Sequence, residues 1–432
     1  MLRKVPWAAA LLGLAAVFLA CGRSSSKMPG SEAASPVALE AALGNRFVKA
    51  GASQTMVARI GLSAKRRSAT ARPPVNLALL VDTSGSMEGK AIADARAASL
   101  ALIGSLAPED RISVVVFHSK AELLLPSTKL DDADARDLRA KIAAMKATGT
   151  TDMASGLRMA VDEVAQHLDR EGVNRVVLVG DGVPNDDRQI LGIVADASAR
   201  GISITALGLG NDYDETLMGR VAQQSGGRFF YVEDSAKVAS FFAEEVTRLH
   251  KVVARNAVLE LQPGPGVTIA HVVGRPVSPA GRGVAVNLGD MSLDDSQEVV
   301  VELASAAAKD GANVEVLDAV LRFQEGVGGK AREERVFVGA KATQDAASLT
   351  QGTEKSVEEA FARARDAAAT LERIETMRNG NRAPSPAPVT DATPRKMRLP
   401  EGVATPAALA KPSPEEIRRQ HDEAMTNFQA HH

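Results

Sequence analysis

The residues best suited to chemistry lie in the segment Asp82-Thr83-Ser84-Gly85-Ser86. The pattern Asp-x-Ser-x-Ser places one carboxylate and two hydroxyls on a single tight loop, and Gly85 allows that loop to turn sharply. All three groups offer oxygen, which hard cations such as Mg²⁺ require. The segment therefore predicts a cation-binding loop.

The element that positions this loop is the apolar run from Asn76 to Val81, which is expected for a strand buried on both faces of a parallel sheet. From there to about Leu249, short apolar runs alternate with amphipathic stretches. This alternation predicts a doubly wound, Rossmann-like α/β domain over residues 76–250. In such sheets ligands bind beyond the carboxyl ends of the strands, at the switch in strand order, so the loop after Val81 is well placed for binding.

The other elements of this domain follow from the same apolar patterns. Strands are expected at 112–117, 122–125, 176–179, 202–209 and 229–232, the second of them at an edge of the sheet. Helices are expected around 92–106, 133–145, 154–168, 188–199, 217–224 and 236–250.

Two further loops accompany the first. Gly149-Thr150-Thr151-Asp152-Met153 precedes an expected helix, and Gly180-Asp181-Gly182 follows the strand at 176–179. With three such loops in this order, the chain resembles the von Willebrand factor A family over about residues 76–249. The segments 207–214 and 225–232 are similar to late strand and loop segments of that family.

The resemblance implies a metal-ion-dependent adhesion site that binds Mg²⁺ or Mn²⁺. Ser84 and Ser86 are expected to bind the ion directly. Asp82 and Asp181 would bind it directly or through water, and Thr151 would join in the ligand-competent state. In the family one coordination position stays open, and an Asp or Glu carboxylate of a partner protein fills it.

Two positions depart from the family pattern. Thr150 stands where many relatives have Gly, so either Thr150 or Thr151 faces the metal, and the alignment favours Thr151. Gly180 replaces the hydroxyl residue that often precedes Asp181, which predicts the loss of a supporting hydrogen bond.

The N-terminus predicts export. Arg3 and Lys4 precede an apolar run, residues 5–20, that is too short to span a membrane, so residues 1–21 are expected to be a secretion signal. The run ends at Leu19-Ala20-Cys21-Gly22, which resembles a bacterial lipobox in which Cys21 is lipidated. The alternative is an ordinary signal peptide that leaves Cys21 as a free thiol. Gly22 after Cys21 favours the outer membrane over the inner one, with the chain facing the periplasm or the cell surface.

The regions around the α/β domain have a different composition. Residues 22–38 are rich in Ser, Gly and Ala and predict a flexible tether. Residues 39–75 contain a candidate strand at 56–62, and residues 255–340 are rich in Val with Pro and Gly turns, which indicates a β-sandwich with the α/β domain inserted in it. A separate C-terminal β domain with a loose N-terminal arm is the alternative.

The C-terminal region is expected to be partly helical. Residues 354–380 carry one apolar stripe, which either packs on its own domain or binds a partner helix. Residues 383–413 are rich in Pro and Ala and are expected to be a disordered linker. Ser413, Pro414 and Glu416 predict the start of a short helix over 414–430.

Composition narrows the class of function. A net charge of -2 over 432 residues gives no indication of nucleic-acid binding, and a single cysteine excludes an internal disulfide. The segment Gly85–Lys90 lacks the spacing of a phosphate-binding loop, and no hydrolase or zinc-protease motif is present. We therefore expect a non-enzymatic lipoprotein that binds a protein partner through the metal site. An envelope assembly or chaperone-like factor, working with another complex or an ATPase, is the second hypothesis.

Overall fold

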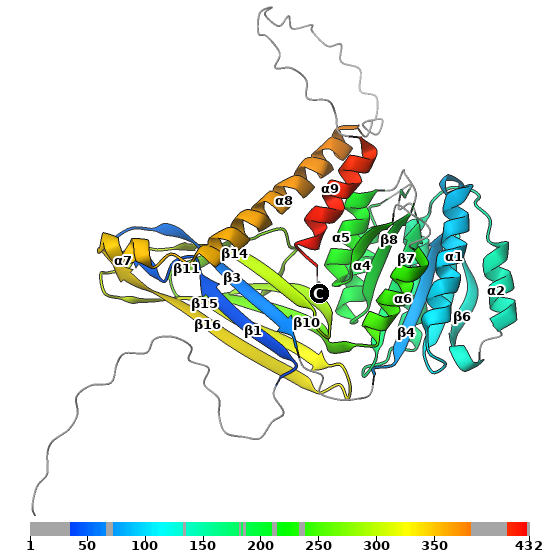
Figure 1. The fold of residues 1–432 in the computed structure, drawn as a ribbon, viewed down its shortest axis with the longest axis horizontal. Coiled ribbons are helices and arrows are strands. Elements are labelled where there is room, and N and C mark those ends of the chain that lie inside the picture. The colour runs from blue at the N-terminus through cyan, green and yellow to red at the C-terminus, as the bar shows by residue number, and fades with distance from the viewer. Residues whose placement is uncertain are drawn as a thin grey trace, which may run out of the picture. The chain divides into compact units, whose positions relative to one another are not determined.

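The computed structural model describes residues 35–65, 72–132, 135–180, 183–184, 187–209, 214–232, 238–381 and 413–429. The described residues contain three β-sheets (Figure 1). Two of the residues predicted to have a function, Cys21 and Asp181, lie outside the described residues. In the part of the chain that is described, no helix is both long and apolar enough to cross a membrane.

The α/β domain is built on a six-stranded sheet with the order β6-β5-β4-β7-β8-β9. All its strands run parallel except the edge strand β6, which is antiparallel to β5. The strands are β4 (Val75–Asp82), β5 (Arg111–Phe117), β6 (Ala121–Lys129), β7 (Val173–Gly180), β8 (Ser203–Leu209) and β9 (Phe229–Val232).

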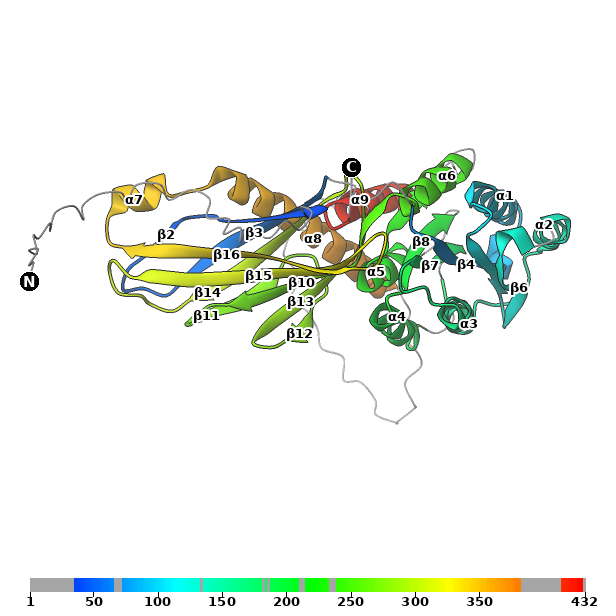
Figure 2. The ribbon, with the colours of Figure 1, turned by 90° about the horizontal axis from the view of Figure 1, so that it is seen from below.

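Helices cover both faces of this sheet (Figure 2). One face carries α1 (Lys90–Ser105), α2 (Ala135–Ala144) and α6 (Val238–Leu249), and the other carries α3 (Met153–Gln166), α4 (Ile190–Ala199) and α5 (Glu215–Ser225). Side chains of β4 alternate between the two layers: Leu79 packs with the first group and Leu80 with the second. These helices on both faces confirm the predicted doubly wound fold. Because both faces of the sheet are covered, β4 is apolar on both sides.

A β-sandwich of two antiparallel-rich sheets is formed by strands on both sides of the α/β domain. The first sheet has the order β1-β3-β14-β11: β1 (Val37–Leu43), β3 (Gln54–Ala64), β14 (Ser296–Ser305) and β11 (Val267–Val272). In the second, the order is β12-β13-β10-β15-β16-β2: β12 (Ser278–Ala280), β13 (Gly283–Ser292), β10 (Val252–Pro263), β15 (Asn313–Glu325), β16 (Ala331–Thr343) and β2 (Phe47–Lys49). Inward residues of both sheets, such as Ile60 and Leu321, share one apolar core.

The pairing of β3 with β14 shows that the α/β domain is an insertion. The two strands pair antiparallel from Gln54 opposite Ser305 to Ser63 opposite Ser296, and the whole α/β domain lies between them in the sequence. The strands β1, β2 and β12 and the short helix α7 (Ala346–Gln351) were not predicted from the sequence.

Two C-terminal helices pack against the rest of the chain. The stripe of α8 (Lys355–Asn381) buries Val357, Ala360 and Ala364 against β3, β14 and the second helix, α9 (Pro414–Thr426), so it packs within its own chain. Ser413 caps α9 by accepting a 3.2 Å hydrogen bond from the backbone N–H of Glu416. The predicted start of this helix is therefore confirmed.

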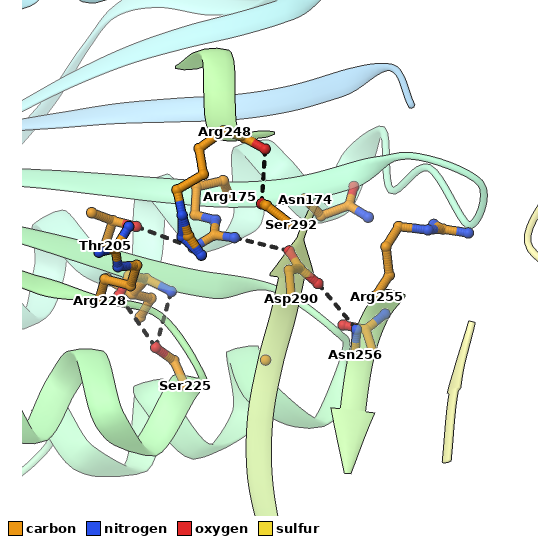
Figure 3. Close-up of polar contacts among 12 residues, drawn as sticks. Asn174, Arg175, Thr205, Ser225, Arg228, Arg248, Arg255, Asn256, Asp290 and Ser292 are labelled. Atoms are coloured by element: carbon orange, nitrogen blue, oxygen red, sulfur yellow. Dashed lines mark hydrogen bonds and ion pairs between the residues drawn. The ribbon is translucent and has the colours of Figure 1, made fainter. Parts of the chain in front are cut away.

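A buried polar network joins the amino ends of β7 and β8 to the sandwich (Figure 3). Arg175 of β7 forms a 2.8 Å ion pair with Asp290 of β13, and Asp290 also accepts the backbone N–H of Asn256. Arg248, at the end of α6, pairs with Asp295 at 2.6 Å. Because buried charges are tolerated only when they are paired, these contacts fix the inserted domain against the sandwich.

Asp110 connects the entry and exit of the inserted domain. Its carboxylate accepts the backbone N–H groups of Val75 and Ala107, lies 2.7 Å from a guanidinium nitrogen of Arg72 and lies 3.0 Å from Nε2 of His250. Burial alone would raise the pKa of Asp110, but these hydrogen bonds lower it to about 2.

The lowered pKa predicts a contribution to stability that depends on pH. Asp110 binds a proton more weakly in the folded chain than in the unfolded one, so its contribution is present above about pH 4 and is lost as the pH falls towards about 2. We expect ~2 kcal/mol of unfolding free energy to disappear over that range. Denaturant unfolding of wild type and Asp110→Asn at pH 5 and 2.5 measures it. Equal acid sensitivity of the two proteins would contradict this assignment.

Candidate functional site

Asp82 lies at the end of the central strand, where the order of the strands reverses. From β4 the chain passes to β5 on one side of the sheet, and it later returns to β7 on the other side of β4. The side chain of Asp82 is fully buried, and its Oδ1 accepts a 2.8 Å hydrogen bond from the backbone N–H of Ser84. This bond fixes the carboxylate relative to the loop that follows it.

The two serines of the loop lie side by side. Ser84 is buried, Ser86 is exposed, and their Oγ atoms are 3.0 Å apart. The loop continues as a short 3-10 turn, Gly85–Met87, which the fully buried side chain of Met87 anchors in the core. Both hydroxyls therefore lie next to the end of β4.

The second loop is bonded directly to the first. The backbone N–H of Thr148 donates to the carbonyl of Thr83 at 2.8 Å, and the N–H of Gly85 donates to the carbonyl of Gly149 at 3.1 Å. These bonds bring Thr151, which is 7% exposed and just precedes α3, to the same edge of the sheet.

Ser119 is hydrogen-bonded to Thr150, the first of the two adjacent threonines. Its Oγ accepts the backbone N–H of Thr150 at 3.0 Å and is also 3.1 Å from the hydroxyl of Thr150. Thr150 is thus tied to Ser119 through both its backbone N–H and its hydroxyl, and the choice between Thr150 and Thr151 as the residue that faces a metal stays a prediction. Sequence reasoning missed Ser119, although its position just after β5, at the carboxyl end of the strand beside β4, is the available signal.

Gly180 ends β7 beside Asp82, and the structure gives a steric reason for its small size. A Cβ atom at this position would overlap with the Cβ of Asp82. Because β7 approaches Asp82 so closely, position 180 has no room for a side chain, and a hydroxyl residue does not fit there. Asp181 itself lies outside the described residues, and its part in the site stays a prediction.

The donor atoms fit a small, hard cation. The Oγ atoms of Ser84 and Ser86 are hydrogen-bonded to each other at 3.0 Å, and neighbouring ligands of an octahedral Mg²⁺ ion, each about 2.1 Å from it, are also about 3 Å apart. In the described part of the chain, no three His, Cys, Asp or Glu side chains gather in a way that could hold a metal. A metal at this loop would therefore be held by hydroxyl oxygens together with the carboxylate of Asp82.

Comparison with known proteins identifies the α/β domain. Residues 76–244 match the von Willebrand factor type A domain family. The chain contains a von Willebrand factor type A (VWA) domain. The match covers the six-stranded sheet and all three predicted loops.

Relatives with similar sequences include uncharacterized bacterial proteins. The chain is 28% identical to the uncharacterized protein sll0103 of Synechocystis over 258 residues, which cover 57% of this chain and 60% of that protein. It is 26% identical to the uncharacterized protein YfbK of Escherichia coli over 222 residues, 49% of this chain and 38% of that protein. The matched regions thus span less than two thirds of either relative.

Solved structures share more than the VWA domain. A von Willebrand factor type A protein from Catenulispora acidiphila superposes with a TM-score of 0.67 at 19% identity, over 82% of this chain and 84% of that one. The ArnB paralog VWA2 from Sulfolobus acidocaldarius has a TM-score of 0.58 at 18% identity, over 80% of this chain and 86% of that one. Since both cover far more than residues 76–244, the similarity in fold extends beyond the VWA domain.

The contact between Gly180 and Asp82 generates a prediction for the VWA domain. Gly180→Ala forces a methyl group into the Cβ of Asp82, and such overpacking costs ~1–3 kcal/mol of unfolding free energy. Gly104→Ala in α1 is the matched control, because a Cβ atom there meets nothing within 4 Å. Denaturant unfolding compares the two variants, and equal stabilities would contradict the steric role of Gly180.

Proposed function

We propose that this protein binds a protein partner through a divalent metal ion held by the VWA domain. The observation that carries the proposal is the joining of two oxygen-bearing loops at the carboxyl end of β4. There the carboxylate of Asp82 is fixed, and the hydroxyls of Ser84 and Ser86 lie 3.0 Å apart. The residues that would hold Mg²⁺ or Mn²⁺ are Asp82, Ser84, Ser86, Thr151 and Asp181.

The chemistry of these residues suits binding rather than catalysis. A bound divalent ion would supply positive charge and a coordination position for an Asp or Glu carboxylate of the partner. Ser84, Ser86 and Thr151 are neutral, so they would leave much of that charge uncompensated. The hydrogen bond from Ser84 to Asp82 and the bonds from the second loop keep the oxygens in place before the partner arrives.

The proposed location is the outer face of a bacterial membrane. The lipobox-like segment at Cys21 would provide a lipid anchor, and residues 22–34 would separate it from β1. The partner would then be another protein of the cell envelope or its surroundings.

Metal binding is the first expectation to test. We expect calorimetry to show one site for Mg²⁺ or Mn²⁺ in the wild-type protein and at least a tenfold loss of affinity in Asp82→Asn and in Ser84→Ala, since each removes a ligand oxygen or its charge. Asp196→Asn, which removes a carboxylate paired with Arg200 at the C-terminal end of α4, is the control and should bind normally. Binding that survives in Asp82→Asn would overturn the proposed site.

Binding of the partner protein should also depend on the metal. Protein captured from envelope extracts in Mg²⁺ should be released by EDTA and should not be captured by Asp82→Asn. Capture that is insensitive to both changes would place the binding surface elsewhere on the chain.

Membrane attachment is tested by Cys21→Ser. We expect the variant to move from the membrane fraction to the soluble fraction, because the thiol that carries the lipid is gone. Mass spectrometry of the wild-type N-terminal peptide should show the added acyl chains. An unlipidated peptide that still carries Cys21 would contradict the anchor.

A further inference from the structure

The C-terminal helix α9 lies where three parts of the chain meet. It packs against α8, α5 and β9 (Figure 1), and Arg373 of α8 donates a 3.1 Å hydrogen bond to Gln420. Its last turn and the residues after it reach the sandwich, where the ring of Phe428 packs in an apolar cluster with Val273 and Val300. The helix therefore contacts both the VWA domain and the sandwich.

Side chains of residues 413–429, the α9 segment, form hydrogen bonds with the edge of the VWA sheet. In the described sheet β9 is the last strand and pairs with β8 on its other side. Oε1 of Gln429 accepts the backbone N–H of Phe229 at 3.0 Å, and the carboxyl of Asp422 accepts the N–H of Tyr231. These N–H groups are two residues apart along β9, so both lie on the same edge of the strand. Two side-chain acceptors thus take positions that a neighbouring strand would occupy.

The surface that α9 covers is complementary in shape to the side chains of residues 413–429. A Cβ atom on Gly219 of α5 would lie 2.9 Å from Cε1 of His421, and one on Gly274 would overlap with the ring of Phe428. The ring of His421 also meets Phe229 edge-on, with centroids 5.3 Å apart. Two glycines thus leave room for the two largest rings of this segment.

The contact buries polar groups as well as the apolar side chains of Ala424, Met425 and Phe428. Arg418, His421 and Gln429 are all buried in it, and the guanidinium of Arg418 lies 5.6 Å above the ring of Tyr231. Burying such groups requires desolvation, so a contact of this kind holds a helix less tightly than an apolar one of equal area. A helix of 13 residues is also only marginally stable alone in water, so leaving the surface means unfolding.

We propose that β9, Gly219 and Gly274 form a helix-binding site, and that residues 413–429 are its exchangeable ligand. The site fits an amphipathic helix and the residues that follow it, with an Asp, a Gln and two aromatic rings spaced as they are in residues 413–429. Residues 382–412 separate α9 from α8, a connection much longer than the roughly 2–8 residues that join neighbouring helices in bundles. A separate peptide with the sequence of α9 therefore competes for the same site.

The charge on Asp422 makes this binding sensitive to pH. Burial raises the pKa of Asp422 to about 6; the neighbouring Glu423 adds to the rise, while the N–H of Tyr231 and the charge of Arg228 oppose it. Arg418 and His421, on the same helix, also face the site. Because the bound segment holds the proton on Asp422 more tightly than the free, unfolded segment does, binding is strongest below about pH 4 and weakens as the pH rises to about 6.

Cleavage of the full-length protein tests whether α9 exchanges. A recognition sequence for a site-specific protease is placed within residues 382–412, so that cutting leaves the α9 segment held by non-covalent contacts alone. A fluorescent peptide of residues 413–429 is then added, and its binding is followed by anisotropy. We expect the peptide to replace the cut segment, to bind about tenfold more weakly at pH 7.5 than at pH 5, and to bind poorly to uncut protein.

Glycine variants locate the site. Gly219→Ala should weaken peptide binding at least tenfold, because the new methyl group meets the ring of His421, and a peptide with His421→Ala should restore it. Gly192→Ala on α4 is the matched control, since a Cβ atom there meets nothing within 4 Å. Alanine also favours helix at both positions, so loss of folding does not explain a difference.

Other outcomes overturn the proposal. A cut segment that never exchanges at either pH is a permanent part of the fold. A peptide that fails to bind protein from which the cut segment has been removed shows that no separable site exists. An Asp422→Asn peptide should bind more tightly at pH 7.5 and lose most of the pH dependence, and an unchanged dependence would exclude Asp422 as its source.

Discussion

The two connections that join the VWA domain to the sandwich meet at the carboxylate of Asp110. The chain enters the domain at Val75 and leaves it at His250, and Asp110 bonds to both residues and to Arg72. One buried charge therefore holds the two connections of the inserted domain together. The ion pairs of Arg175 with Asp290 and of Arg248 with Asp295 extend this attachment across the amino ends of the strands.

The amino and carboxyl ends of the VWA strands carry different kinds of polar groups. At the amino ends, arginines and carboxylates are buried in pairs; the burial of Arg228 lowers its pKa to about 10, and nearby arginines keep the pKa of Glu245 low although burial would raise it. At the carboxyl ends, hydroxyl and carboxylate oxygens gather on loops bonded to one another through Thr83 and Gly85. The first end fixes the domain against the sandwich, and the loops of the second end are held on a rigid sheet.

Local patterns predicted the features that depend on local sequence. The buried strand before Asp82 and the strand β9 follow from short apolar runs, and the start of α9 follows from Ser413 and Pro414. The strands β2 and β12 have three residues each, too few for a pattern to be visible.

Contacts between distant residues were not predictable in this way. Arg175 and Asp290 are 115 residues apart, and nothing near either one indicates that it is paired. Gly180 showed the same limit: the sequence suggested a missing hydroxyl, whereas its neighbour across the sheet, Asp82, requires the absence of a side chain. The roles of Asp181 and Cys21 stay predictions, because both lie outside the described residues.

The pairing of β3 with β14 has a consequence for the order of folding. Arg59 and Glu298, which meet across these strands, are 239 residues apart, so a ribosome must complete the VWA domain before β3 can meet its partner. Contacts within the VWA domain close shorter loops and form sooner, whereas long-range β pairing is slow and leaves strand edges exposed to aggregation. In a nascent chain β3 can bond to β1 alone, and the sandwich is completed only after the strands that follow the VWA domain have been made.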